Sequence, residues 1–219
     1  MLLHLLFPPK CTLCKSLLKK NETDFCHHCR THTPEVLRTK RNIPFIAQWT
    51  AVWYYKDDVR KSIHRFKFGN ARSYADAYAR PLAVKLQEEG ISDRFDLMTW
   101  VPTSPLRRFT RGYDQAELLT KALSKELGRS PLPLLKRIRH TPPQSRLRDA
   151  SARRANIQGA YRAIASQKLS GMRVLLLDDV VTTGATASEC ARVLLTAGVK
   201  EVTFAAVAAA NHDKTNERR

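Results

Sequence analysis

Short apolar runs alternate with longer amphipathic stretches along most of the chain, as is typical of an α/β protein. Residues 174–177 are all apolar, a run too short for a helix but right for a buried parallel strand. Residues 96–101 and 202–210 predict two further strands, and alternation in residues 50–55 predicts another. We therefore expect a mostly parallel sheet flanked by helices in a doubly wound arrangement.

Helical spacing of apolar residues fills the intervals between these strands. Val59, Ile63 and Phe66 predict a helix over 59–68, and residues 74–89 predict a second that stops at Gly90. A third helix begins near residue 115, and a fourth runs from about 187 to a stop at Gly198.

Two acids, Asp178 and Asp179, follow the 174–177 strand, at the edge where open α/β sheets place their ligands. The next residues supply hydroxyls, a position without a side chain and successive amides that open a helix, a combination suited to a phosphate: Thr182, Thr183, Gly184, Ala185 and Thr186. Paired carboxylates would repel an anion unless they accept hydrogen bonds from sugar hydroxyls or face a divalent metal. A sugar phosphate satisfies both demands, although an ordinary strand–loop–helix is the alternative.

The stretch from the strand to Thr186 resembles the phosphoribosyl pyrophosphate (PRPP) motif of type I phosphoribosyltransferases. The resemblance implies that Asp178 and Asp179 contact the ribose 2- and 3-hydroxyls and act as the catalytic pair. It also implies that the loop with Val180 and Thr182–Thr186 surrounds the 5-phosphate, with Mg²⁺ bound alongside PRPP.

A second informative segment, residues 102–116, places three arginines and a glycine between a strand and a helix: Arg107, Arg108, Arg111 and Gly112. Arginine recognises phosphate by planar, two-pronged hydrogen bonding, although a basic surface loop is the alternative. Here the chain resembles the ComF/GntX family, with Tyr113-Asp114 where the family usually has Phe-Asn. The resemblance covers nearly the whole chain and implies that this segment is the pyrophosphate-binding loop.

Residues 131–160 are rich in arginine and poor in apolar residues. The resemblance makes this segment a flap that covers the site and excludes water, with Gln144, Arg153, Arg154 and Asn156 as its site residues. It could equally track single-stranded nucleic acid, although it contains no aromatic residue to stack bases.

The first thirty residues carry four cysteines in two C-x₂-C pairs: Cys11, Cys14, Cys26 and Cys29. Two such knuckles complete a tetrahedral metal site, so we expect structural zinc that supplies the folding energy of a segment too small to bury a core. Iron and a pair of disulfides remain alternatives to zinc. Cys190 lies on a predicted helix face and is most simply a small buried residue.

The 219 residues carry 38 Lys and Arg against 20 Asp and Glu, for a net charge of +18. Such a balance attracts polyanions, whether nucleic acid or a phosphorylated small molecule. No stretch is long enough for a membrane span, and no secretory leader is evident, so we expect a cytoplasmic protein. We divide the chain into a zinc-ribbon module (1–33), a linker (34–48), a phosphoribosyltransferase-like domain (49–210) and a polar tail (211–219).

The family resemblance implies a phosphoribosyltransferase-domain protein that binds PRPP with Mg²⁺ and supports DNA uptake in natural transformation. The alternative is a non-catalytic accessory that senses PRPP or a related ribose phosphate and binds single-stranded DNA. Competence or DNA-processing proteins are possible partners in either case. The sequence contains no recognisable base-reading pocket, so the acceptor of any transfer reaction is not identified.

Overall fold

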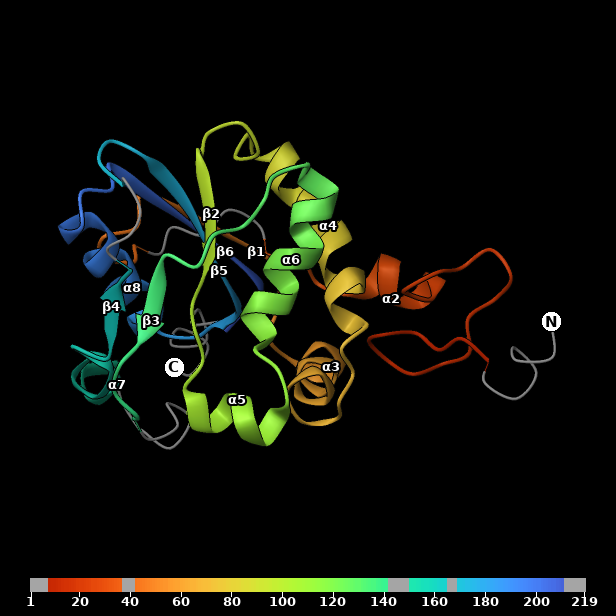
Figure 1. The fold of residues 1–219 in the computed structure, drawn as a ribbon. Coiled ribbons are helices and arrows are strands. Elements are labelled where there is room, and N and C mark those ends of the chain that lie inside the picture. Colours follow the sequence, from red (N-terminus) through yellow and green to blue (C-terminus); the bar gives the residue numbers. More distant parts are fainter. Residues whose placement is uncertain (1–7, 37–41, 142–149, 165–168, 211–219) are drawn as a thin grey trace, which may run out of the picture.

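The computed structural model describes residues 8–36, 42–141, 150–164 and 169–210 (Figure 1). Its centre is a four-stranded parallel sheet in the order β1-β6-β5-β2. The strands are β1 (Gln48–Tyr54), β2 (Leu97–Trp100), β5 (Arg173–Val181) and β6 (Glu201–Ala209). The expected parallel sheet with flanking helices is confirmed.

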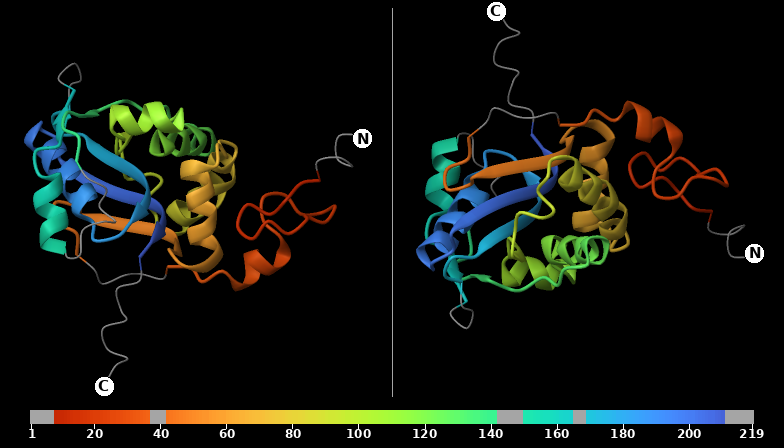
Figure 2. Two further views of the ribbon diagram at one scale, coloured as in Figure 1. Left: turned by 90° about the horizontal axis from the view of Figure 1, so that it is seen from below. Right: turned by 90° about the horizontal axis from the view of Figure 1, so that it is seen from above.

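Helices cover both faces of this sheet, and each face has its own apolar core (Figures 1 and 2). One core contains α3 (Asp57–Phe68), α4 (Tyr74–Glu88) and α6 (Gln115–Leu127), and the other contains α8 (Ala185–Thr196). Strand β5 serves both cores because successive side chains point to opposite faces. Leu175 and Leu177 belong to the first core, and Val174 and Leu176 belong to the second.

Strand β5 is longer than the apolar run that predicts it. It continues through Asp178 and Asp179, because Val180 and Val181 also pair with Ala208 and Ala209 of β6. The acids therefore lie inside the strand, near its carboxyl end, and do not follow it. Their side chains leave the sheet on opposite faces.

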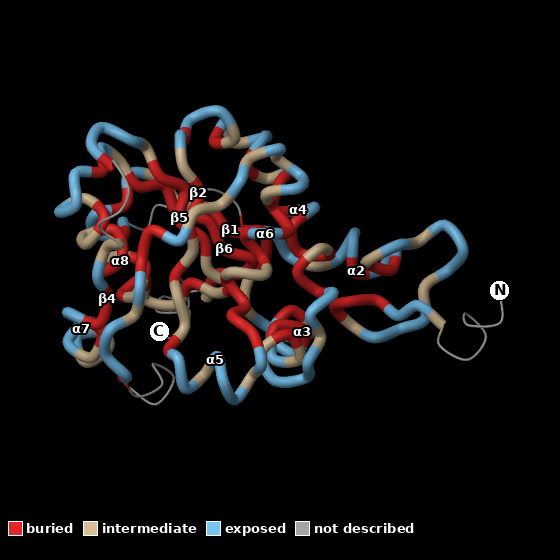
Figure 3. The backbone as a smooth tube through the Cα atoms, in the orientation of Figure 1, coloured by how far each residue is buried: buried red, intermediate tan, exposed pale blue. Residues whose placement is uncertain are grey.

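A short helix, α5 (Pro105–Arg111), lies where the sequence pattern predicts only a basic loop. Ser104 caps it by accepting a hydrogen bond from the backbone of Arg107, Pro105 occupies its first turn, and Gly112 ends it in a left-handed conformation. None of its residues is buried, and Figure 3 shows it as an exposed segment below the buried sheet.

The segment before the PRPP-like motif contains further elements that the sequence pattern did not predict. Strands β3 (Leu135–Arg137) and β4 (Tyr161–Ala163) form an antiparallel pair beside α8, and α7 (Ala150–Ile157) lies between them in sequence. In the view of Figure 1, α7 and α5 both lie at the bottom of the molecule.

The N-terminal module, with its helix α2 (His27–His32), packs against α3 and α4 and projects from the side of the domain (Figure 2). Its residues Cys11, Leu13 and Phe25 belong to the same apolar core as α3 and α4, and the Phe25 ring meets Trp53 edge to face. The following residue Glu35 pairs antiparallel with Trp53 at the edge of the sheet. Within the part of the chain that is described, no helix is long and apolar enough to span a membrane.

Candidate functional site

The exit of β5 and the start of α8 line a pocket that is partly open to solvent. Its lining includes all but one of the residues predicted to hold a ribose phosphate, namely Asp178, Val180 and Thr182–Thr186, and Asp179 is the one that does not line it. Val181, Ala187 and Phe204 complete the lining. Backbone amides at the N-terminus of an α-helix attract anions, since the helix leaves them without internal partners. The start of α8 can therefore offer backbone N–H groups to an anion in this pocket.

Gly184 gives this loop its conformation. It caps α8 at a φ of 79°, in the left-handed region that favours glycine. A Cβ atom at this position would also lie 3.0 Å from the side chain of Ile43, which is almost fully buried. Ile43 belongs to the segment that joins the module to the domain, so this segment packs directly on the loop.

The two acids have different surroundings. Asp179 is buried on the face of α3, where its Oδ1 accepts from Nζ of Lys67 at 2.9 Å. Asp178 is half-buried, and its Oδ1 accepts a hydrogen bond from the backbone nitrogen of Asp179 at 2.8 Å.

Burial, followed by the charge of Asp179, raises the pKa of Asp178 well above its ordinary value, and the ammonium of Lys67 only partly opposes this. Burial likewise opposes the charge of Lys67, but the nearby carboxylates of Asp179 and Asp178 outweigh it and raise the pKa of Lys67. The site therefore combines a charged lysine–carboxylate pair with a neighbouring carboxyl group that holds its proton more tightly than usual.

The arginines of the predicted pyrophosphate loop face different surroundings on and around α5. Arg107 is half-buried and donates to the carbonyl of Thr141 at 3.3 Å, while exposed Arg108 forms an ion pair with Glu117 at 3.4 Å. Arg111 donates to the side chain of Gln115 at 2.8 Å and lies over the ring of Phe68.

The guanidinium of Arg137 lies near that of Arg107. Arg137 of β3 donates to the hydroxyl of the same Thr141, and it lies over the ring of Tyr161. Burial, followed by the charges of Arg137 and Arg111, lowers the pKa of Arg107. Among the described residues, neither Arg107 nor Arg137 forms an ion pair with a carboxylate, so this cluster of positive charge is suited to a bound anion.

Tyr113 and Asp114, which replace the usual Phe-Asn of the resembled family, have structural partners. The hydroxyl of Tyr113 donates to the carbonyl of Phe66 at the end of α3. The carboxylate of Asp114 caps α6 and accepts from the backbone nitrogen of Thr103 at 2.7 Å. The acid therefore holds the two ends of the arginine segment together.

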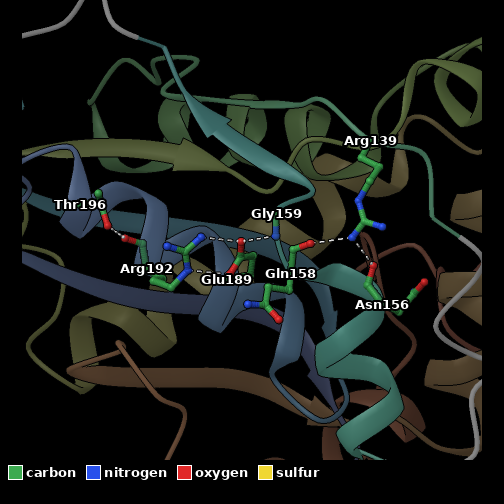
Figure 4. Close-up of polar contacts among 7 residues, drawn as sticks. All are labelled: Arg139, Asn156, Gln158, Gly159, Glu189, Arg192 and Thr196. Carbon is green, nitrogen blue, oxygen red and sulfur yellow. Dashed lines mark hydrogen bonds and ion pairs between the residues drawn. The ribbon is translucent and has the colours of Figure 1, made fainter.

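The predicted flap lies partly outside the described residues, and Gln144 is among those left out. Arg153, Arg154 and Asn156 lie on α7. Figure 4 shows how this helix is fastened: Arg139 donates to the carbonyls of Asn156 and Gln158 at its C-terminal end.

The turn after α7 is attached to α8, the helix that follows the PRPP-like motif. The backbone nitrogen of Gly159 donates to Glu189 at 2.8 Å, and Glu189 also accepts from Arg192 (Figure 4). The C-terminal end of the predicted flap is thus anchored to α8, the helix that begins at the pocket.

The four cysteines of the module converge as their spacing predicts. The sulfur atoms of Cys11, Cys14, Cys26 and Cys29 all lie within 4.8 Å of one another. Tetrahedral zinc with Zn–S bonds of about 2.3 Å fits such a cluster. Burial raises the pKa of both Cys26 and Cys29, and a bound cation would favour the thiolate forms of these two side chains. Cys190 is buried in α8, as expected.

Sequence reasoning did not identify Lys67 or Arg137 as site residues. Lys67 is one of several cations in or near α3, and Arg137 is one of many in residues 131–160, so composition does not single out either one. The sequence signal for Lys67 is its place at the end of the helix that follows the first strand. This position alone does not show that the lysine lies near the carboxyl edge of the sheet, because that depends on how the helix packs.

Comparisons with known proteins agree with both parts of the chain. Residues 114–219 match the family model of the phosphoribosyl transferase domain, and residues 2–40 match that of the double zinc ribbon domain. Together with the four-cysteine cluster, the second match supports structural zinc.

Among solved structures, the chain is similar to glutamine PRPP amidotransferase from B. subtilis complexed with ADP and GMP. The identity is 20% and the TM-score is 0.41, and the match covers 61% of this chain and 26% of that one.

Several relatives match most of the chain. The DNA utilization protein YhgH of Escherichia coli K12 is 28% identical over 88% of this chain and 86% of its own. Competence protein F of Haemophilus influenzae is 30% identical over 212 residues, which span 91% of this chain and 90% of the relative. Since this similarity includes both the cysteine module and the phosphoribosyltransferase domain, the chain belongs to the ComF family of competence proteins.

Proposed function

We propose that this protein binds PRPP with Mg²⁺ at the carboxyl edge of its sheet and supports DNA uptake in natural transformation. The observation that carries the proposal is the pocket at the start of α8, where Asp178 and the hydroxyl-rich loop from Thr182 to Thr186 share one lining. The loop would hold the 5-phosphate through backbone amides, and Asp178 and Asp179 would accept hydrogen bonds from the ribose hydroxyls.

The pyrophosphate end of PRPP is expected toward the arginines. Arg107 and Arg111 lie on α5, which follows the neighbouring strand β2, and Arg107 has no carboxylate partner among the described residues. Bound Mg²⁺ would neutralise pyrophosphate charge through oxygen ligands. The protein's contribution would be to place cations around the leaving group and to exclude water with the flap.

The first test is calorimetric titration of Mg·PRPP into the wild-type protein and into Asp178→Asn/Asp179→Asn, with intact folding checked for both. Binding that is lost in the double variant supports the site. A wild-type protein that does not bind PRPP contradicts it.

Turnover requires a separate assay, because a bound sugar phosphate can be a signal as well as a substrate. We would measure pyrophosphate release in the presence of PRPP and candidate acceptors. Release that depends on both indicates a transferase, and binding without release favours the alternative of a PRPP-sensing accessory protein.

The role in DNA uptake is supported by the names of the relatives, which include a competence protein and a DNA utilization protein. A net charge of +18 favours a polyanionic partner, and we propose single-stranded DNA in the cytoplasm. Helix α5 favours the single-stranded form, because the Phe109 side chain is 87% exposed on the same helix as Arg108 and Arg111. An exposed ring flanked by cations can stack an unpaired base.

The DNA proposal predicts that affinity for an oligonucleotide falls steeply as salt concentration rises. Affinity should also fall when Arg146, Arg148, Arg153 and Arg154 are neutralised together, and a weaker effect is expected for Phe109→Ala. Fluorescence anisotropy measures both. Unchanged binding in the arginine variant would exclude the flap as the DNA-binding segment.

A further inference from the structure

Lys67 is the cation that lies against the acid pair. Its Nζ is 2.9 Å from Oδ1 of Asp179, and the side chains are 24% and 8% exposed, respectively. A buried carboxylate beside a second carboxyl group is costly unless a cation compensates for it. This pair therefore differs from the exposed ion pairs of the same helix, such as Lys61 with Asp58.

The end of α3 is fastened to the predicted pyrophosphate loop, which fixes where Lys67 can lie. The hydroxyl of Tyr113 donates to the carbonyl of Phe66, the residue before Lys67. Arg72 donates to the carbonyl of Gly112 at 3.1 Å, and Arg111 covers the ring of Phe68, the residue after Lys67. Lys67 is thus held between the loop and the acid pair by contacts on both sides.

Lys67 contacts only one of the two carboxylate oxygens of Asp179. Oδ1 is occupied by Lys67, and no hydrogen bond to Oδ2 is present among the described residues. A carboxylate held at one oxygen keeps its orientation while the other oxygen can accept a hydrogen bond.

We propose that Lys67 is a positioning residue for the ribose: its ammonium holds Oδ1 of Asp179 so that Oδ2 is left to accept from a ribose hydroxyl. The inference rests on the proposed PRPP site. It assigns Lys67 to the sugar and not to the phosphates. Substitution of Lys67 should therefore weaken the binding of ligands that contain ribose and of no others.

The experiment uses three probes, Mg·PRPP, ribose 5-phosphate and Mg·pyrophosphate, titrated by calorimetry into the full chain. Lys67→Met should weaken the two ribose-containing probes roughly ten- to a hundredfold, as loss of an orienting partner does around metal ligands. Binding of Mg·pyrophosphate should not change. Lys67→Arg, which keeps the cation, should restore most of the affinity, and Lys61→Met on the exposed side of α3 is the matched control.

A double-variant comparison tests whether Lys67 acts through Asp179. Lys67→Met/Asp179→Asn should bind ribose 5-phosphate no more weakly than Asp179→Asn alone, because the lysine then has no carboxylate to position. This variant also removes both charges, so it remains informative if Lys67→Met alone fails to fold.

The contrary outcomes separate this inference from the proposed function. Equal affinity of wild type and Lys67→Met for ribose 5-phosphate overturns the role of Lys67 and leaves the PRPP site standing. Weaker binding of Mg·pyrophosphate to Lys67→Met also overturns it, since the lysine would then contact phosphate directly. A wild-type protein that binds none of the probes removes the proposed site and this inference with it.

Discussion

Arg65 of α3 donates a hydrogen bond from Nη2 to the carbonyl oxygen of Thr12 at 3.0 Å, and Thr12 lies between the metal-site cysteines Cys11 and Cys14. The same nitrogen contacts the carbonyl of Leu13, and Ser62 of α3 also donates to Thr12. The first cysteine knuckle therefore rests on the helix that carries Lys67 toward the acid pair. The module and the sheet domain share one packed interface.

Arg65→Met should lower the free energy of unfolding by about 1–3 kcal/mol, because the carbonyls of Thr12 and Leu13 lose their charged donor. Methionine keeps much of the apolar stem, so the change reports mainly the hydrogen bonds. Urea unfolding measures it, with Arg60→Met on the exposed side of the same helix as the control. Equal stability of the two variants would contradict a structural role for the Arg65 contacts.

Cys14→Ser should abolish stoichiometric zinc and lower the melting temperature of the whole chain more than Arg65→Met does. Structural zinc contributes about 10–16 kcal/mol in isolated zinc-finger peptides. Here the module also shares its core with α3 and α4, so the loss of zinc should also destabilise the sheet domain. Elemental analysis and calorimetry check both effects.

Cys190→Ala is the matched control for zinc content, since Cys190 is buried in α8 away from the four-cysteine cluster. It should keep its metal. If Cys14→Ser also retained stoichiometric metal, another ligand would have to complete the site.

Gly184→Ala should be destabilised more than Gly128→Ala. Both glycines have a positive φ, 79° and 65°, which costs a non-glycine residue about 1–2 kcal/mol. Only at position 184 would the new Cβ also meet a side chain, that of Ile43 at 3.0 Å, whereas nothing lies within 4 Å at position 128. Chemical denaturation measures the free energy of unfolding of both variants. The difference between their losses gives the cost of the contact with Ile43, because both share the backbone strain.

Ile43→Ala, made alone and in the Gly184→Ala background, tests the origin of the difference, because alanine lacks the three carbon atoms that the new Cβ would meet. If the contact with Ile43 is responsible, Gly184→Ala should cost less stability in the Ile43→Ala background than in the wild type, and the part due to φ should remain. An identical loss at positions 184 and 128 would show that Ile43 moves away without cost.

Asp96 should make stability depend on acid pH. Its hydrogen bonds with Arg173 lower the pKa of Asp96 to about 2 from an ordinary 3.8. A carboxyl group with a lower pKa in the folded state stabilises above its unfolded pKa, and this contribution is lost as pH falls from about 4 to about 2.

Asp96→Asn should therefore be less stable than wild type at neutral pH, and the two curves should converge near pH 2. The difference should be small, because both side chains of the pair are partly exposed to solvent. Denaturant titrations across this pH range check it, with exposed Asp58→Asn as the control. A difference that persists undiminished at pH 2 would assign the effect to packing instead of charge.

Local patterns in the sequence were sufficient for several parts of this molecule. The apolar run before Asp178 predicts a buried strand, the hydroxyl-rich loop after it predicts an anion pocket, and the cysteine spacing predicts a four-sulfur cluster. Each is a short segment whose conformation follows from its own residues. The structure confirms the strand and the cluster, and a pocket lies beside the loop, whose anion binding stays a prediction. The signals for α5 were also local, since Ser104-Pro105 and Gly112 mark its ends.

Contacts between distant segments could be decided only by the tertiary structure. Lys67 meets Asp179, Ile43 covers Gly184, and Arg107 shares Thr141 with Arg137. Nothing in the spacing of these residues encodes the pairs, because a sequence rich in lysine and arginine offers many equivalent cations. The packing of α3 brings Lys67, and not its neighbouring cations, to the acids. The sequence alone therefore determined the kinds of chemistry present, and the fold determined which charges lie within hydrogen-bonding distance of each other.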